Sequence, residues 1–319
     1  MNGSLAVAPS ADGVAPKHAG ATIAFSISLA LALWPGSAAL AQATADAPLS
    51  KLFEDIRVDA AYTYDNNVNR APNGTERLSE QFFALNATKN FTHVVDPSSR
   101  VLLDLAGGGE LTRSFPALGR VFGEIQPSFQ YRKSADFYSP TLAGFARFSA
   151  EHFGSSLRSG YRYAVGVSAL QPVTDRIDLF GVISYNWRNA NSRVFDGEDL
   201  SVQLTMDWSF GAHGTLYVVG EYRRGDVVST GPESLVNLDI AKVFVRDDAY
   251  TNPQLLSYRF EADTVIGMLG YNLPLGRAGA IDVSWRIARS TPTQDAGFQG
   301  AGTPHYVDNQ FMVVYSKRF

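Results

Sequence analysis

The sequence contains no cysteine, which excludes a disulfide scaffold, a thiolate metal site and a cysteine nucleophile. It also lacks an excess of basic residues, because 27 Lys and Arg stand against 31 Asp and Glu. A general nucleic-acid-binding protein needs a basic surface that displaces counterions from phosphate, so we expect no nucleic-acid partner. Only one apolar run could even be considered for a helical membrane span, which excludes a bundle of transmembrane helices.

That apolar run lies near the N-terminus, where residues 21–34 read ATIAFSISLALALW after Lys17. Its length and its flanks are typical of a secretory signal peptide, and small-x-small cleavage sites follow it. The mature chain is then expected to begin at Gln42 or Thr44. An uncleaved anchor or a misassigned start codon is the alternative, because the stretch before the run carries one lysine. The predicted organisation is a signal peptide over 1–41, a periplasmic segment over 42–54 and a single folded domain over 55–319.

From Asp55 onward, apolar residues recur at every second position over segments of about ten to fourteen residues. In the first segment, Ile56 and Val58 share one face, whereas Arg57 and Asp59 share the other. Alternation over such lengths is the signature of a transmembrane β-barrel. A soluble β-sandwich also alternates, but its strands usually run about five or six residues, too short to cross a membrane.

Twelve such segments can be counted, an even number as a single-chain bacterial barrel requires. They cover approximately residues 55–64, 80–92, 100–113, 120–133, 141–153, 158–170, 176–189, 198–210, 214–226, 256–271, 279–289 and 306–319. The longest connections fall on one side, as extracellular loops should, and both chain ends fall on the periplasmic side. The predicted fold class is therefore all-β, an antiparallel up-and-down barrel of about twelve strands in the outer membrane of a Gram-negative cell, surrounded by its lipid.

The last segment carries aromatic residues at alternate positions, Phe311, Tyr315 and Phe319. This pattern resembles the C-terminal signature of bacterial outer-membrane β-barrel proteins, where it is the assembly signal read by the barrel-assembly machinery. The resemblance implies that this machinery is a partner, although Lys317 stands where an apolar residue is usual. Residues 62–70 (YTYDNNVNR) also resemble the opening of uncharacterised porin-like barrels, including some associated with exopolysaccharide export.

With the apolar face toward lipid, the opposite face of each segment should line a lumen. In the tenth segment this places Phe260, Ala262 and Ile266 against lipid and Glu261 and Asp263 inside. The predicted basic pore-lining residues are Arg132, Arg147, Arg158, Arg162 and Arg188. The predicted acidic pore-lining residues are Asp59, Glu221, Glu261, Asp263 and Asp282. A basic wall would then face an acidic one and orient polar solutes, unless these charges pair with one another and only solvate a narrow interior.

The longest connection, Val227–Leu255, has apolar residues that should not be left in water. It also contains Asp239, Lys242 and Arg246, which suit a polar lumen and make it a candidate constriction loop. We expect it either to fold inward at the barrel mouth or to extend two strands beyond the membrane. Its part Leu235–Val245 could be a helix, an extra strand or an inserted loop.

These features predict a porin-like channel for small polar or charged solutes, with no cofactor and no bound metal. Asp65 with Asn66 and Asn67, like Asp247 with Asp248, could hold calcium, but turn chemistry explains both groups equally well.

A structural or partner-holding barrel in an envelope or exopolysaccharide-export assembly is the second hypothesis, with an envelope protein as its partner. The third is a lipid hydrolase, for which His152 with Ser155 or Ser156 is the nearest pair. Its spacing differs from that of outer-membrane phospholipases, so we expect no enzyme. The sequence identifies neither the solute nor the oligomeric state.

Overall fold

The computed structural model describes residues 56–72, 74–134, 136–276, 278–294 and 304–319. The predicted signal peptide and the segment 42–54 lie outside these residues, so both stay predictions. Within the described ranges, no helix combines the length and the apolar character needed to cross a membrane.

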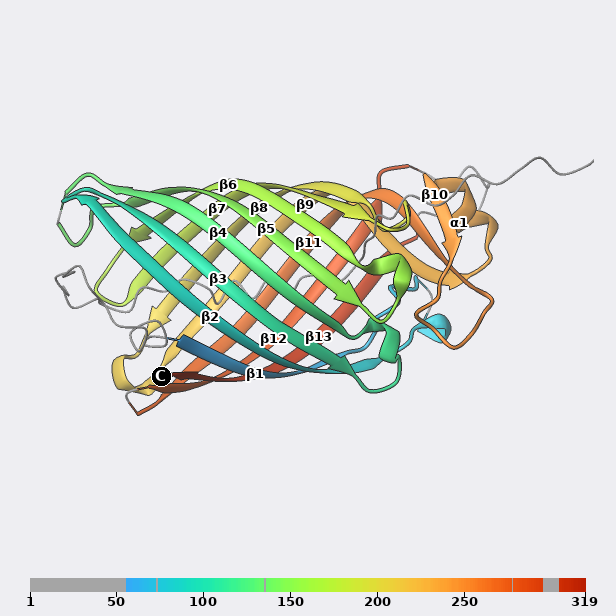
Figure 1. The fold of residues 1–319 in the computed structure, drawn as a ribbon, viewed down its shortest axis with the longest axis horizontal. Coiled ribbons are helices and arrows are strands. Elements are labelled where there is room, and N and C mark those ends of the chain that lie inside the picture. Colours follow the sequence, from blue (N-terminus) through green and yellow to red (C-terminus); the bar gives the residue numbers. More distant parts are fainter. Residues whose placement is uncertain (1–55, 73, 135, 277, 295–303) are drawn as a thin grey trace, which may run out of the picture.

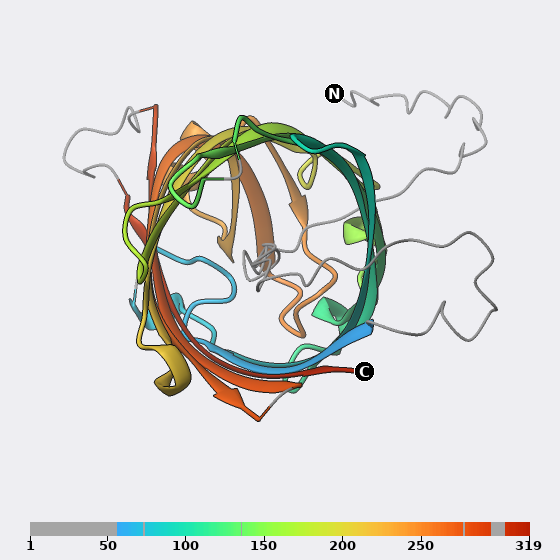
Figure 2. The same ribbon diagram turned by 90° about the vertical axis from the view of Figure 1, so that its left-hand side faces the viewer.

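The protein is a closed antiparallel β-barrel (Figure 1). Each strand of the wall pairs with its neighbours, and β1 pairs with β13, which closes the ring (Figure 2). The wall consists of β1 (Ile56–Asp65), β2 (Glu80–Asp96), β3 (Ser99–Thr112), β4 (Arg120–Arg132), β5 (Thr141–Phe153), β6 (Gly160–Pro172), β7 (Ile177–Ala190), β8 (Gly197–Ser209), β9 (Thr215–Pro232), β11 (Leu255–Leu275), β12 (Gly279–Pro292) and β13 (Tyr306–Arg318). The prediction of a twelve-stranded antiparallel barrel is confirmed.

Side chains alternate between the outer and inner faces of this wall. On β8, Leu200, Val202 and Leu204 are exposed outward, whereas Ser201 is buried inside. Exposed tyrosine and tryptophan side chains stand near both ends of the strands: Tyr64, Tyr161, Tyr185 and Tyr222 at one end, and Tyr131, Trp208, Tyr271 and Tyr315 at the other. An apolar belt between two aromatic girdles is the surface of an outer-membrane barrel, so the strands span the bacterial outer membrane.

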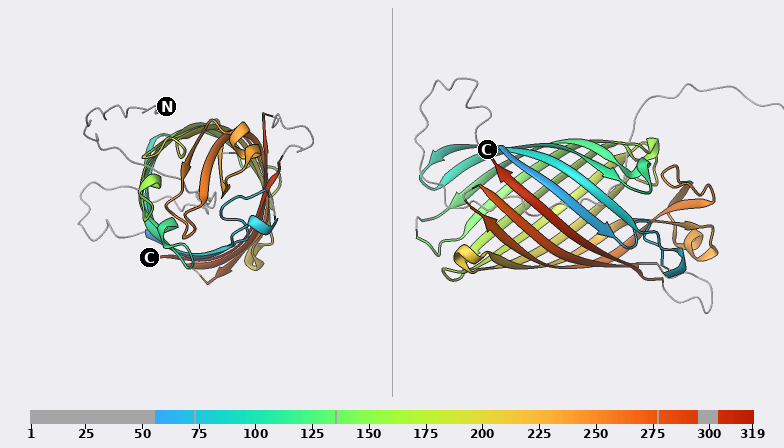
Figure 3. Two further views of the ribbon diagram at one scale, coloured as in Figure 1. Left: turned by 90° about the vertical axis from the view of Figure 1, so that its right-hand side faces the viewer. Right: turned by 90° about the horizontal axis from the view of Figure 1, so that it is seen from below.

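The two ends of the barrel differ in their connections (Figure 3). Short turns join β2 to β3, β6 to β7 and β11 to β12, whereas the connections from β1 to β2 and from β9 to β11 are long. The end with short turns is the periplasmic end. Arg57 of β1 pairs with Arg318 of β13 at that end, so the start of β1 and the end of β13 lie on the periplasmic side that the sequence predicts for both chain ends.

Between β9 and β11, the two alternatives that the sequence offered, an inward fold at the barrel mouth and an extension of two strands, occur together. The two strands continue past the wall until Pro232 pairs with Leu255, so they do extend. Between them the chain forms α1 (Leu235–Ile240) and β10 (Val243–Arg246), and β10 pairs with the outer end of β11. The chain then turns back into the mouth of the barrel (Figures 1 and 3).

Helix α1 covers one face of the extended strands. Its Ile240 packs with Val227, Phe260, Ala262 and Tyr306 in a buried cluster. These apolar residues are therefore covered by protein rather than by lipid. We call the parts of β9 and β11 that continue past the wall the extension; its other face is free to approach the lumen.

Candidate functional site

The loop after β1 folds into the barrel and is held there by asparagine side chains (Figure 2). The Asn67 amide donates to the carbonyls of Ala71 at 3.0 Å and Val307 at 2.8 Å. Asp65 accepts from the Asn67 backbone N–H at 2.7 Å. Both side chains thus fix the turn, and no group of acidic or histidine residues in the described chain is arranged to hold a metal ion.

Asn69 joins this loop to the extension of β9. Its amide donates to the Thr230 carbonyl at 2.9 Å, and the Thr230 N–H donates back to the Asn69 carbonyl at 2.8 Å. The Asn69 side-chain oxygen accepts from the Leu78 N–H at 2.8 Å. The next residue, Arg70, has a φ of 52°, and its carbonyl accepts from the Ser229 hydroxyl at 2.9 Å.

A second segment enters the mouth directly after β10. The buried carboxylate of Asp247 forms an ion pair with Arg158, which lies in the turn between β5 and β6. Asp247 also accepts from the hydroxyls of Ser257 at 2.5 Å and Thr230 at 3.1 Å, and from the Ala249 N–H at 2.9 Å. A buried charge held by this many donors fixes the segment across the lumen.

The neighbouring carboxylate, Asp248, ties the same segment to the turn between β5 and β6. It accepts from the Ser155 hydroxyl and from the Ser156 N–H, the latter at 3.0 Å. We call residues 247–250, with these contacts, the mouth segment.

Tyr250 packs the mouth segment against the other outer loops. Its ring meets Phe115 edge-on, with 4.9 Å between centroids, and its hydroxyl lies 3.5 Å from the Val68 carbonyl. Leu118 and Ala249 belong to the same buried cluster. Burial raises the pKa of the Tyr250 hydroxyl above its ordinary value.

A second apolar cluster forms around Val194 and Phe195, in the connection between β7 and β8. Val243 and Val245 of β10 pack against it. The Arg158 guanidinium lies 4.5 Å from the centroid of the Phe195 ring. The mouth segment and the outer loops, packed against the extension, thus form one plug over the lumen.

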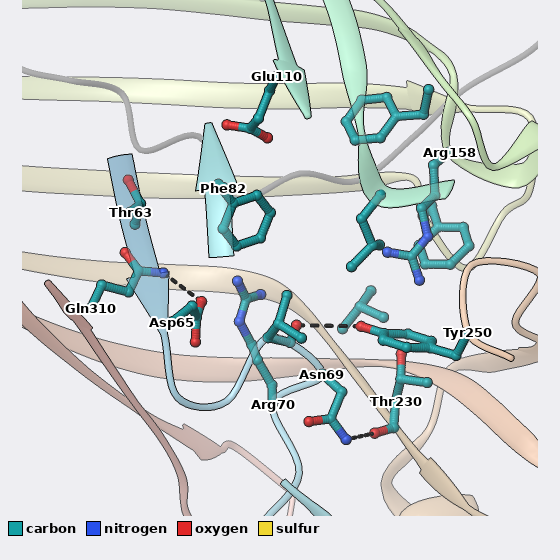
Figure 4. Close-up of a pocket in the computed structure, with 15 residues that line it drawn as sticks. Thr63, Asp65, Asn69, Arg70, Phe82, Glu110, Arg158, Thr230, Tyr250 and Gln310 are labelled. Carbon is teal, nitrogen blue, oxygen red and sulfur yellow. Dashed lines mark hydrogen bonds between the residues drawn. The ribbon is translucent and has the colours of Figure 1, made fainter. Parts of the chain in front are cut away.

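Beneath the plug is a cavity of about 70 Å³ (Figure 4). Arg70 and Arg158 enter it from different elements. Burial lowers the pKa of Arg70 to about 10, partly offset by Asp308 and Asp65, so Arg70 is charged at neutral pH. The cavity is lined by Thr63, Asp65, Val68, Asn69, Arg70, Phe82, Glu110, Leu118, Phe153, Arg158, Phe195, Val228, Thr230, Tyr250 and Gln310.

In the outer half of the lumen, charged side chains pair with one another. Glu151 forms ion pairs with Arg120 and, at 2.9 Å, with Arg162. Arg120 also lies 3.5 Å from Glu110, and Arg188 stands directly opposite Arg162 on the next strand. On the far wall, the pairs are Arg223 with Glu221 and Arg286 with Asp308.

In the periplasmic half, Asp178, Asp207 and Asp282 form no ion pair among the described residues, whereas Asp59 of β1 pairs with Arg57 at 3.1 Å. Asp178 of β7 is directly opposite Asp207 of β8, and the Tyr217 hydroxyl donates to Asp282 at 2.8 Å. The Tyr217 ring crosses Gly270, where a Cβ atom would come within 2.2 Å of it. Glycine at this position therefore allows the contact between β9 and β12.

Basic residues stand on the other side of this half. Arg57 and Arg318 pair across β1 and β13, and Arg100 and Arg132 lie near the periplasmic ends of β3 and β4. Five strands separate β1 from β7 on either side of the ring, which makes the two strands diametrically opposite. Arg57 is paired with Asp59, so the charge on the wall opposite β7 is partly neutralised.

The predicted basic residues do not form one wall. Arg162 and Arg188 are together in the outer half, and Arg147 donates to a glutamine of β4 at 2.7 Å. Arg158 belongs to the plug, and Arg132 donates to carbonyls of the periplasmic turn that follows β4.

Among the predicted acidic residues, Asp59, Glu221 and Asp282 face the lumen. Asp59 accepts from the Ser316 hydroxyl at 2.6 Å, and Glu221 accepts from Ser201 at 2.6 Å.

Glu261 and Asp263 do not line the lumen, and the sequence prediction is corrected here. Asp263 shares its face of β11 with Val265, which is 61% exposed toward lipid, and accepts from the exposed Tyr222. The sequence assigned the inward and outward faces of β11 the wrong way round, because apolar residues occupy both faces of this strand. Phe260 looked lipid-facing in the sequence but is buried beneath α1.

The predicted constriction residues lie beside the plug rather than in the cavity. Asp239 is in α1, Lys242 forms an ion pair with Asp226 at 2.8 Å, and Arg246 ends β10. The residues that enter the mouth follow immediately after them.

The aromatic residues of the expected assembly signal lie along β13. Phe311 and Tyr315 are exposed on the outer face, and Lys317 lies 4.8 Å from the Phe319 ring. Recognition by the assembly machinery stays a prediction.

The candidate hydrolase pair is separated by the wall. His152 alternates with the inward residues Glu151 and Phe153 and is exposed outside. Ser155 is buried in the mouth, where it donates to Asp248.

Sequence reasoning missed the residues that hold the plug, chiefly Asn67, Asn69, Asp247 and Tyr250. The only signals were the asparagines of residues 62–70 and the adjacent pair Asp247 and Asp248. Turn chemistry explains both signals equally well. The local sequence does not identify their partners, which lie in distant parts of the chain.

Comparisons with known proteins agree with this architecture. No family model matches the sequence, and no curated protein matches it. An outer membrane channel from Pseudomonas putida F1 is similar in structure, with a TM-score of 0.50 and 10% identity over 83% of this chain and 96% of that one. The NanC porin has a TM-score of 0.43 and 9% identity, with 82% of this chain and 100% of that one covered. The translocator domain of autotransporter NalP from Neisseria meningitidis has a TM-score of 0.43 and 12% identity, with 85% of this chain and 92% of that one covered. At these identities the likeness concerns the fold alone.

Proposed function

We propose that this outer-membrane barrel is a channel for small polar or charged solutes, closed at its outer mouth by its own loops and opened when they withdraw. The observation that carries the proposal is the contrast between the wall of the lumen and the plug that covers it.

The wall is a closed hydrogen-bonded ladder with charged side chains inside it from the outer to the periplasmic end. Polar residues lining a barrel support the passage of water and polar solutes. At the periplasmic end, Asp178 and Asp207 have no cation beside them in the described structure, and the field of these carboxylates would orient a dipolar solute.

The plug is held differently, by side chains and short loop contacts. Its chief attachments are the Asp247–Arg158 ion pair, the bonds between Asn69 and Thr230, and two small apolar clusters. A segment with few attachments opens at a lower free energy than a continuous strand ladder. The plug can therefore move while the barrel stays intact.

Planar-bilayer recording tests the proposal. Pro232 and Leu255 are directly paired, so an Asn-Gly turn can replace residues 233–254 and still close the hairpin. We expect infrequent openings of the unmodified channel and a steady, larger conductance of this shortened variant. Heat-modifiable migration on a gel confirms that each protein is a folded barrel.

A folded shortened barrel that conducts no ions would overturn the channel. Co-purification of a stoichiometric envelope protein with such a non-conducting barrel would then favour the partner-holding alternative.

A further inference from the structure

We propose that the cavity beneath the plug binds the acidic group of a solute at Arg158 and Arg70, in competition with Asp247. The chemical class is an oxyanion: a carboxylate or a phosphate carried by a small polar molecule. This inference rests on the proposed channel and names the group that the channel recognises.

Arg158 has the geometry of an anion-binding side chain. Its side chain is 6% exposed, and its guanidinium lies 4.5 Å from the centroid of the Phe195 ring and 5.6 Å from that of the Tyr250 ring. One Nη atom is paired with Asp247, whereas the buried Nε–H has no acceptor among the described residues. A guanidinium can donate two parallel bonds to one oxyanion, so Arg158 retains a donor for a second acceptor.

Arg70 reaches the same cavity from the loop after β1 (Figure 4). Its φ of 52° is in the left-handed region, which costs a residue with a Cβ about 1–2 kcal/mol. The bonds that flank it, from Thr230 to Asn69 and from Ser229 to Arg70, hold this conformation. The loop thus keeps a long cationic side chain in the cavity in spite of the backbone strain.

The acidic residues that line the cavity are already engaged. Asp65 accepts from the Asn67 N–H at 2.7 Å and from Gln310 at 2.8 Å, and Glu110 lies 3.5 Å from Arg120. Arg158 and Arg70 are the two cationic side chains among the residues that line the cavity, so they are the donors that an entering anion would meet.

The size and the walls of the cavity suit a single acidic group. About 70 Å³ holds roughly five water molecules, or the acidic group of a solute with fewer waters. Phe82, Phe153 and Tyr250 provide aromatic walls, and a low local dielectric strengthens charge-assisted hydrogen bonds. The carboxylate of Asp247 reaches Arg158 from the mouth segment, so a solute that takes its place would also release the plug.

Isothermal titration calorimetry of the purified barrel in detergent tests this site. The probes are D-glucuronate, which carries a carboxylate, glucose 6-phosphate, which carries a phosphate, and neutral glucose. We expect at least one acidic probe to bind and glucose not to bind. Arg158→Gln should weaken binding about tenfold or more, because it removes a charge-assisted contact.

Asp247→Asn gives the sharper result, since removing the competing carboxylate should tighten binding about tenfold. Asp248→Asn is the matched control: it loosens the same segment without freeing an arginine, so it should change the affinity much less than Asp247→Asn does. Equal affinities of the two variants would mean that Asp247 acts only by holding the segment, and this result would overturn the proposal, as would no binding of any probe to the unmodified barrel.

Binding and conductance separate the two proposals. A protein that conducts ions but binds no acidic probe overturns this site and leaves the channel standing. A protein that binds the probes while its shortened, folded variant conducts no ions overturns the channel and leaves the site standing.

Discussion

The outer and periplasmic halves of the lumen contain similar charged residues but use them differently. In the outer half, Glu151 is shared by Arg120 and Arg162, and Asp247 ties the plug to Arg158. In the periplasmic half, Asp178 and Asp207 stand side by side with no cation beside them in the described structure, and on the opposite wall Arg57 is paired with Asp59.

The difference shows that charge inside a barrel has two distinct uses. Paired charges at close range fix structure, because a buried pair that loses one partner is strongly destabilised. Separated charges leave a field in the aqueous space and act on whatever passes. We therefore expect substitutions in the outer half to change opening and substitutions in the periplasmic half to change ion preference.

The largest effect is expected for Asp247→Ala, which leaves Arg158 buried without its partner. Losing one member of a buried pair costs about 3–5 kcal/mol, enough to shift a loop equilibrium more than a hundredfold. Single-channel recording should show the channel open for most of the time. Asp263→Ala removes an exposed carboxylate of the outer rim and should leave the gating unchanged. Equal gating in the two variants would mean that the plug does not depend on this pair.

A smaller change is expected when Asp178, Asp207 and Asp282 are all replaced by asparagine. The periplasmic half would then lose three carboxylates and keep its basic residues, so the reversal potential in a salt gradient should move toward anion preference. Open probability should stay the same, because these residues do not touch the plug. Asp175→Asn, in an exposed periplasmic turn, is the control. An unchanged reversal potential would show that ions do not pass this acidic side.

Asn69→Ala should loosen the loop after β1 by about 1–3 kcal/mol, since its amide bonds the carbonyls of Glu76 and Thr230. The expected result is faster cleavage of residues 66–79 by a protease added to the folded barrel. The exposed Asn189 offers a control variant, Asn189→Ala, for which cleavage should match the unmodified protein. Equal rates for both variants would assign the loop's position to other contacts.

The smallest effect is expected for Tyr217→Phe, which deletes the hydroxyl that donates to Asp282. One hydrogen bond contributes about 1 kcal/mol, so the temperature at which the barrel unfolds on a gel should fall by a few degrees. The exposed Tyr222 makes an equivalent bond at the rim, and Tyr222→Phe should shift this temperature less. A larger shift for Tyr222→Phe would contradict the importance of the buried bond.

The barrel itself could be predicted from the sequence because its period is local. On β1, Asp59 and Thr63 are buried inside while Tyr64 is exposed, as the alternation predicts. The prediction failed on β11, where Phe260 and Ala262 are apolar for packing against α1 rather than for lipid. A period alone does not tell which of two apolar environments covers a residue.

The plug could not be predicted for a different reason. Asp247 and Arg158 are 89 residues apart, and Asn69 and Thr230 are 161 apart. No local pattern encodes such pairs, and acidic or asparagine residues in loops have ordinary turn functions. The predicted inward fold of Val227–Leu255 was correct in direction because its apolar residues needed cover, but its predicted polar residues were not the ones that enter.

The most direct test of the account is a reversible crosslink of the plug. Ser155 and Asp248 are in hydrogen-bond contact, and the chain has no cysteine of its own, so Ser155→Cys with Asp248→Cys can form a single defined disulfide. In a background that also carries Asp247→Asn, the oxidised channel should conduct as little as the unmodified protein, and reduction should open it several-fold. Unchanged conductance on reduction of a verified crosslink would contradict the claim that the mouth segment closes the lumen.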